Sequence, residues 1–249
     1  TSGASHPGVP VVLNFDLDNE PARSTVAEVY EQIISDMTTG ISLMNGNSRS
    51  SNSNTLSPTS VRALLAKVYL FQEDWTNAEA MSSSVIESGD YSLVSNANYY
   101  DLWTTDNSSE SIFEISMIKY PDINGFDNVK VVRLAEMYLI RAEARAEMGT
   151  DIAGAQDDLD MVRQRAIADE PDNTDTGDAL NDAIFLERRL ELAFEGQRLW
   201  DLMRNQMDIV RTNCTAQICL IPYGADTVIM PIPQDETDVN PNIEQNPGY

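Results

Sequence analysis

The sequence has few basic residues and one histidine, and each shortage excludes a class of function. Its 249 residues include 16 lysines and arginines against 40 aspartates and glutamates, a formal net charge of −24. A nucleic acid or an anionic membrane surface binds basic protein surface, so we expect neither as a partner. The single histidine, His6, lies in an irregular N-terminal segment, so no Ser-His-Asp or Cys-His catalytic set is credible. A glycine-rich phosphate-binding loop is also missing.

Long apolar runs and an initiator methionine are missing as well. No run of about 18 apolar residues occurs, which argues against a transmembrane helix. The chain opens with TSGASHPGVPVV, and no signal peptide precedes it. We therefore expect a chain that is incomplete or processed at its N-terminus. Hydrophobic residues make up 42% of the sequence, which allows a substantial core.

Cysteine is scarce, and the two that occur, Cys214 and Cys219, are separated by four residues. Three states are open: a metal site, a local disulfide and free thiols. A metal site needs further thiols or histidines nearby, and the spacing differs from the Cys-x-x-Cys redox motif. We favour a disulfide that closes a small hairpin or loop, and we expect no metal or other cofactor. A disulfide would favour an oxidising location outside the cytoplasm.

Residues 131–149, VVRLAEMYLIRAEARAEMG, form the strongest predicted helix. Leu134, Tyr138 and Ala142 recur at four-residue spacing, and nearly every residue is a strong helix former. Glu143 is expected on the polar side. Because several of the apolar positions are alanine, a neighbouring helix can approach closely.

That neighbour is predicted directly after the first helix. Asp151 can cap a second helix, and the pair forms a helical hairpin over about 131–168. A similar hairpin is predicted over about 58–88. In it an aromatic residue, Trp75, follows the turn and an alanine comes three positions later, a pattern typical of tetratricopeptide-type repeats. The sequence therefore predicts a mostly α fold, with a tetratricopeptide-like helical-repeat core (an α-α superhelix) and irregular loops.

The N-terminal part of the chain predicts one more helix and the middle a short strand. Ser24 or Thr25 can cap a helix that runs to about Met44. Ile112 to Ile115 fits a short buried strand.

The C-terminal part predicts helices over about 178–210, with a break near Gly196. The remaining tail, 211–249, is rich in proline and is expected to be extended. We treat 1–249 as a single domain.

Three segments, in this order, resemble one known family. They are VVRLAEMYLIRAEARAEMG (131–149); ERRLEL (187–192) followed by FEGQRLWDL (194–202); and PIP (231–233) followed by NPNI (240–243) and QNPGY (245–249). The combination is similar to the SusD/RagB family of outer-membrane nutrient-binding lipoproteins, and the resemblance covers most of the chain.

The resemblance implies a function for the whole protein. In that family a tetratricopeptide-like core contacts a TonB-dependent, SusC-like transporter, and loops bind a glycan or sometimes a peptide. We therefore expect a surface-exposed, lipid-anchored outer-membrane protein that captures oligosaccharide and delivers it to the transporter, and no enzymatic activity. The alternative is a helical-repeat scaffold that binds other proteins and no small molecule.

Two departures from the family pattern affect the expected site. No lipidated cysteine precedes Thr1, and the segment between Ile115 and Val131 is short where the family usually has a long insertion. We expect the anchor and much of the family's binding surface to be absent from this chain. No family binding residue can be transferred by motif.

Five residues are candidates for ligand binding on their chemistry alone. Tyr99 and Trp103, near Tyr100, can stack on a pyranose ring, although we favour a packing cluster. A loop holds Tyr120, Asn124 and Phe126, an aromatic and amide set suited to a sugar, although a loop packed on the core is favoured there.

The charge-rich segment 187–201 allows a catalytic interpretation, which we weigh against a structural one. Paired carboxylates such as Glu187 and Glu195 would suit a glycosidase, but ion pairs that lock a helix junction explain them better. We interpret the acidic loop 169–178 as solvated rather than as a calcium site. We expect Trp200, like Trp75, in the core.

Overall fold

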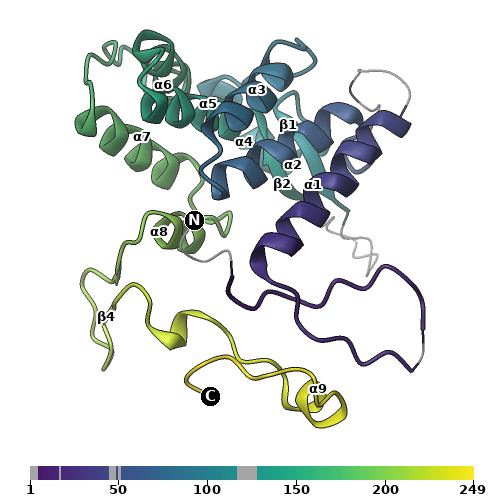
Figure 1. Ribbon diagram of the computed structural model, residues 1–249. Helices are drawn as coiled ribbons and strands as arrows, with labels where there is room; N and C mark the ends of the chain where they lie inside the picture. Colours follow the sequence, from purple (N-terminus) through teal and green to yellow (C-terminus); the bar gives the residue numbers. More distant parts are fainter. Residues whose placement is uncertain (1–4, 17, 45–48, 50–51, 117–127) are drawn as a thin grey trace. The chain divides into compact units, whose positions relative to one another are not determined.

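The computed structural model describes residues 5–16, 18–44, 49, 52–116 and 128–249, and most of its regular structure is helical (Figure 1). The mostly α prediction is confirmed. The chain divides into two compact units, one of residues 36–195 and one of residues 1–35 with 196–249, which we describe separately. The single-domain interpretation stays a prediction. None of the described helices is long and apolar enough to cross a membrane.

Two helical hairpins and one further helix form the larger unit, 36–195. The helices are α2 (Pro58–Phe71), α3 (Trp75–Ile86), α5 (Leu134–Met148), α6 (Ile152–Ala166) and α7 (Asp178–Glu191). Local sequence fixes their ends: Ser57 and Ser60 form a reciprocal cap on α2, and Asp151 accepts the Gly154 amide at the start of α6. Gly149, in the left-handed conformation at φ 64°, ends α5.

Helix α5 contributes to two separate apolar clusters, and this organises the unit. On one side Met137, Ile140 and Ala144 pack with residues of α2 and α3. On the other side its small side chains, including Ala142, pack with α6 and α7. Ala142 is fully buried, as expected for a close helix crossing. The alanine-rich pattern therefore serves a helix with partners on both sides.

Two predictions about α5 are wrong. The helix begins at Leu134, because Val129–Arg133 forms strand β2, which pairs antiparallel with β1 (Ser111–Ile115). Glu143 is buried rather than on a polar face, and its carboxylate lies 3.9 Å from the Arg188 guanidinium. The apolar periodicity predicted the helix correctly. It could not predict that Glu143 is buried, because the charged partner of Glu143 comes from another helix.

The smaller unit contains both ends of the chain. Helix α1 (Val26–Leu43), whose last turns belong to the larger unit, begins at a cap in which Thr25 and Glu28 bond each other reciprocally. Helix α8 (Arg198–Arg204), strands β3 (Ile209–Val210) and β4 (Leu220–Ile221), and helix α9 (Gln234–Val239) follow. Short elements thus interrupt the tail that was predicted as extended.

Polar contacts rather than apolar packing hold this smaller unit together. Arg23 donates to the backbone carbonyls of Pro7 and Gly8 and to the Asn246 side chain, which ties the N-terminal segment to the tail. Trp200 is 57% exposed, so its assignment to the core is wrong. Trp75 does pack against the core of the larger unit.

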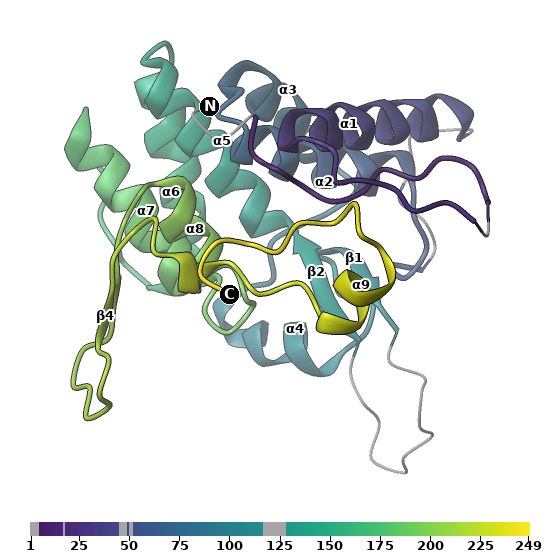
Figure 2. The ribbon, with the colours of Figure 1, turned by 60° about the horizontal axis from the view of Figure 1, so that its bottom comes forward.

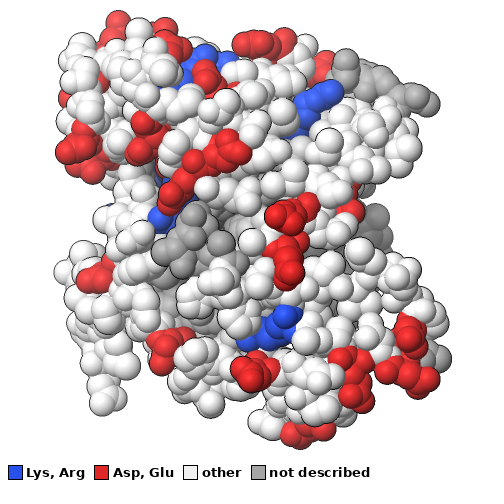
Figure 3. All heavy atoms as spheres, in the orientation of Figure 1, with Lys and Arg blue, Asp and Glu red and all other residues white. Residues whose placement is uncertain are grey.

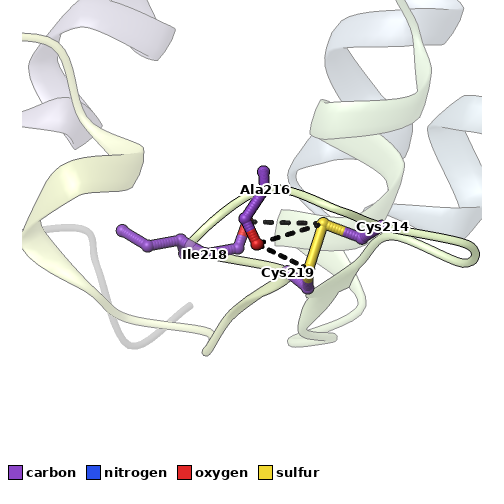
Figure 4. Close-up of a disulfide and its surroundings, with 4 residues drawn as sticks. All are labelled: Cys214, Ala216, Ile218 and Cys219. Atoms are coloured by element: carbon purple, nitrogen blue, oxygen red, sulfur yellow. Dashed lines mark hydrogen bonds between the residues drawn. A yellow bond between two sulfur atoms is a disulfide. The ribbon is translucent and has the colours of Figure 1, made fainter.

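The two cysteines lie in the β3–β4 hairpin. Cys214 and Cys219 form a disulfide with an S–S distance of 2.12 Å, and Figure 4 shows it closing the loop between the strands. The Arg211 amide also donates to the Cys219 carbonyl across the hairpin. The exposed loop therefore has a covalent constraint that its short strands do not supply.

Candidate functional site

Two of the candidate ligand-binding residues lie on one short helix in the larger unit. Helix α4 (Tyr99–Thr104) places Tyr99 and Trp103 one turn apart, with ring centroids 6.3 Å apart and ring planes at 78°. Both side chains are half-buried, and the buried Leu102 anchors the helix. Tyr100 lies on the same helix and is 76% exposed. The pair forms an aromatic corner of which part stays accessible.

The end of α4 lies beside the β1–β2 ladder, as Figure 2 shows. The Lys130 ammonium of β2 donates to the carbonyl of Thr105, the residue after α4, and pairs with Glu114 of β1 at 2.8 Å. These contacts attach the aromatic helix to the two strands.

Each ring of the aromatic corner lies against an arginine. The Arg165 guanidinium carbon is 4.9 Å from the centroid of the Tyr99 ring, and that of Arg133 is 5.7 Å from the Trp103 ring. Both arginine side chains are buried. Such cation–π contacts stabilise more strongly when they are desolvated.

The two arginines belong to a buried ion network. Arg133 donates to Glu110 at 2.6 Å, to Glu195 at 2.8 Å and to Glu191. Arg165 donates to Glu110 at 3.0 Å and also pairs with Glu191. Glu110 directly precedes β1, Arg133 ends β2, Arg165 lies in the last turn of α6, and Glu191 and Glu195 lie at and after the end of α7, so the network joins these four elements. Three carboxylates face two guanidiniums.

Burial and charge shift several pKa values in opposite directions. Burial alone would lower the pKa of Arg133, but the carboxylates of Glu195 and Glu191 raise it well above its usual value. Burial raises the pKa of Glu195, which the Arg133 charge offsets only in part. Burial also raises the pKa of the Tyr99 hydroxyl. Arg133 therefore stays charged, and burial disfavours the charged form of Glu195.

The structure changes the expected partners of the charged segment. Glu191 and Glu195 form ion pairs at a junction, as predicted, but their partners are Arg133 and Arg165 from distant elements rather than arginines on the same helix. Glu187 lies 3.9 Å from Arg163 of α6. The sequence could not reveal this network, because its members are far apart along the chain.

The other three candidates, Tyr120, Asn124 and Phe126, lie outside the described residues. Within the part of the chain that the structure describes, no group of three His, Cys, Asp or Glu side chains is placed to hold a metal ion. The acidic character of the sequence is visible on the face shown in Figure 3, where red side chains are scattered and blue ones are few. Burial of arginines such as Arg133, Arg165 and Arg188 contributes to this imbalance.

Comparison with known proteins assigns the chain to a family. Residues 69–249 match the model described as the SusD family, and residues 4–70 match one described as "Starch-binding associating with outer membrane". The chain belongs to the SusD family. The resemblance recognised in the sequence is confirmed.

Two curated relatives are SusD-like proteins of Formosa agariphila. SusD-like protein P38 is 31% identical over 176 residues, which is 65% of this chain and 32% of that protein. SusD-like protein P25 is 34% identical over 151 residues, 55% of this chain and 28% of that protein. The matched part of the chain thus spans about a third of the length of these relatives.

Solved structures of SusD members agree with the fold. A SusD superfamily protein from Bacteroides thetaiotaomicron has a TM-score of 0.87 at 27% identity, covering 99% of this chain and 72% of the other. A protein described as a putative sugar binding protein from Bacteroides vulgatus has a TM-score of 0.85 at 27% identity, covering 99% and 71%. The tetratricopeptide-like core is therefore the SusD fold.

Proposed function

We propose that this SusD member is a non-catalytic, cell-surface subunit that captures oligosaccharide and delivers it to a SusC-like, TonB-dependent transporter in the outer membrane. The observation that carries the proposal is the aromatic corner of Tyr99 and Trp103, half-exposed above a buried ion network in a SusD-family chain. Aromatic faces of this kind suit the apolar face of a pyranose ring.

The descriptions of similar proteins support the same class of ligand and place. One matched family model is described as starch-binding and as associating with the outer membrane, and one similar solved structure as a putative sugar binding protein. A lipid anchor and the SusC-like partner follow by analogy with the family and belong to the proposal.

The carboxylates near the aromatic corner support binding rather than catalysis. Glu191 and Glu195 direct their oxygens to Arg133 and Arg165, and Glu110 is fully buried between the same arginines. A glycosidase needs a carboxylic acid and a carboxylate that both reach the glycosidic bond. These groups are engaged in ion pairs instead.

Affinity electrophoresis through gels that contain a panel of polysaccharides tests the proposal, with calorimetry on each glycan that retards the protein. We expect one glycan class to retard it, with no release of reducing sugar. Trp103→Ala should abolish the retardation, and Tyr100→Ala, on the exposed side of the same helix, should preserve it. Circular dichroism establishes that both variants are folded.

Failure of every glycan to retard the protein would contradict the proposal and favour a protein-binding scaffold. Release of reducing sugar that Glu195→Gln abolishes would contradict the non-catalytic part.

A further inference from the structure

We propose that Arg165 is a positioning residue for the ligand platform: its planar guanidinium fixes the Tyr99 ring, and through it the angle between Tyr99 and Trp103. This inference rests on the proposed function, because it concerns the same aromatic corner. It adds a residue that acts through the Tyr99 ring rather than by contact with a ligand.

Arg165 covers one face of the Tyr99 ring. The Arg165 side chain is 6% exposed and lies over the Tyr99 ring, so the ring face toward it is closed to a ligand. Tyr99 itself is half-buried, so part of the residue stays exposed to solvent. A ligand would therefore contact a ring whose other face already rests on a cation.

The remaining contacts of Arg165 hold its guanidinium plane in place. One terminal nitrogen donates to Glu110 at 3.0 Å and the other pairs with Glu191. Its buried Nε has no hydrogen-bond partner among the described residues, so two terminal bonds and the Tyr99 ring are what orient the group. A planar fork can meet two carboxylates and a ring face together, whereas an ammonium is a point charge.

The second ring depends on this arrangement. Tyr99 meets Trp103 edge to face at 78°, and Trp103 lies over Arg133, which shares Glu110 and Glu191 with Arg165. A tilt of the Tyr99 ring therefore removes the edge contact with Trp103. The two arginines and their shared carboxylates hold the two rings as one unit.

Arg165→Lys tests the inference, because it keeps the charge beside Glu110 and Glu191 and removes the planar group. Arg163→Lys is the matched control: Arg163 lies two residues earlier on α6 and pairs with Glu170, and among the described residues it makes no cation–π contact. We would measure the ring and indole NMR signals of Tyr99 and Trp103, glycan affinity and thermal stability for both variants.

We expect Arg165→Lys to shift the ring signals and to weaken glycan binding about tenfold, a loss of about 1.4 kcal/mol in binding free energy, because the Tyr99 ring is no longer held at its angle to Trp103. Arg163→Lys should change neither. Unchanged ring signals in Arg165→Lys, or equal changes in both variants, would overturn the inference. If the unmodified chain binds no glycan, the proposed function fails, while the NMR signals still decide whether Arg165 positions the rings.

Discussion

The two units of the chain are stabilised in different ways. In residues 36–195, apolar clusters lie on both sides of α5, and the charged groups that are buried beside them form ion pairs. In the unit of 1–35 and 196–249, Leu202 is the one apolar side chain that is buried among the described residues. Hydrogen bonds from Arg23, Asn240 and Asn246, with one disulfide, hold that unit instead.

The two units should therefore differ in how strongly a single substitution changes their stability. A core packed on both sides of one helix is sensitive to each methylene and each unpaired charge. A unit held mainly by separate hydrogen bonds tolerates most single changes, since each contact contributes about 1 kcal/mol. Changes of the same kind should therefore have unequal effects in the two units.

The largest effect is expected from removal of the central cation. Arg133→Met would leave Glu110, Glu191 and Glu195 buried without their shared partner, and we expect a loss of roughly 3–5 kcal/mol in unfolding free energy. Denaturant titration measures it. Arg211→Met, at an exposed position of the smaller unit, should stay within about 0.5 kcal/mol. Comparable losses in the two variants would remove the distinction between the units.

A second test adds volume rather than removing charge. Ala142→Leu inserts a branched side chain where α5 meets α6 and α7, so we expect a loss of about 1–3 kcal/mol. Ala216→Leu makes the same change in the exposed hairpin loop and should leave the melting temperature unchanged. An unchanged melting temperature for Ala142→Leu would show that the crossing is not close.

The same contrast explains what the sequence could and could not predict. The hairpins around α5 were predictable because apolar spacing, caps and Gly149 all act within a few residues. The ion network was not, because Glu110, Arg133 and Arg165 become neighbours only through the fold. Trp200 was misplaced because a helical pattern suggests a buried face even where the unit has almost no core.

The aromatic candidates show a second limit of what the sequence could predict about the site. Residue chemistry identified Tyr99 and Trp103, and i, i+4 spacing on α4 brings them together. Composition and spacing carried no information about the arginines beneath the rings, which come from β2 and α6.

The disulfide provides a smaller and more local test. Replacing both Cys214 and Cys219 by serine releases a short loop, with a cost of roughly 2 kcal/mol in the chain-entropy model. We expect faster amide exchange in the β3–β4 hairpin and no change in the unfolding of residues 36–195. A lower unfolding midpoint for the larger unit would contradict the separation of the units.

A comparable local effect is expected at the tail. Asn246 donates to the Met230 carbonyl at 2.7 Å and accepts from Arg23, so Asn246→Ala should loosen the contact between tail and N-terminal segment by about 1–2 kcal/mol. Hydrogen exchange of the Met230 and Arg23 regions measures this. Asn14→Ala, at an exposed position, is the control. Equal exchange in the two variants would mean that Asn246 does not secure the tail.

The smallest expected effect concerns pH and tests what the buried charges of the larger unit contribute. Burial raises the folded-state pKa of Glu195, so its contribution is complete below the unfolded pKa and is lost as pH rises through the higher folded value. Burial also acts to raise the pKa of Glu114, but hydrogen bonds from Lys130 and other groups lower it, so its contribution is lost as pH falls through the folded value.

Two glutamine variants should therefore have pH dependences of opposite sign. With rising pH, Glu195→Gln should become more stable relative to the unmodified chain, and Glu114→Gln less stable. Urea titrations across the acidic to neutral range measure both. If the unfolding free energies of the two variants changed with pH in the same way, the third carboxylate of the network around Arg133 would carry no energetic cost. The excess of carboxylates over guanidiniums beneath the aromatic corner would then not affect stability.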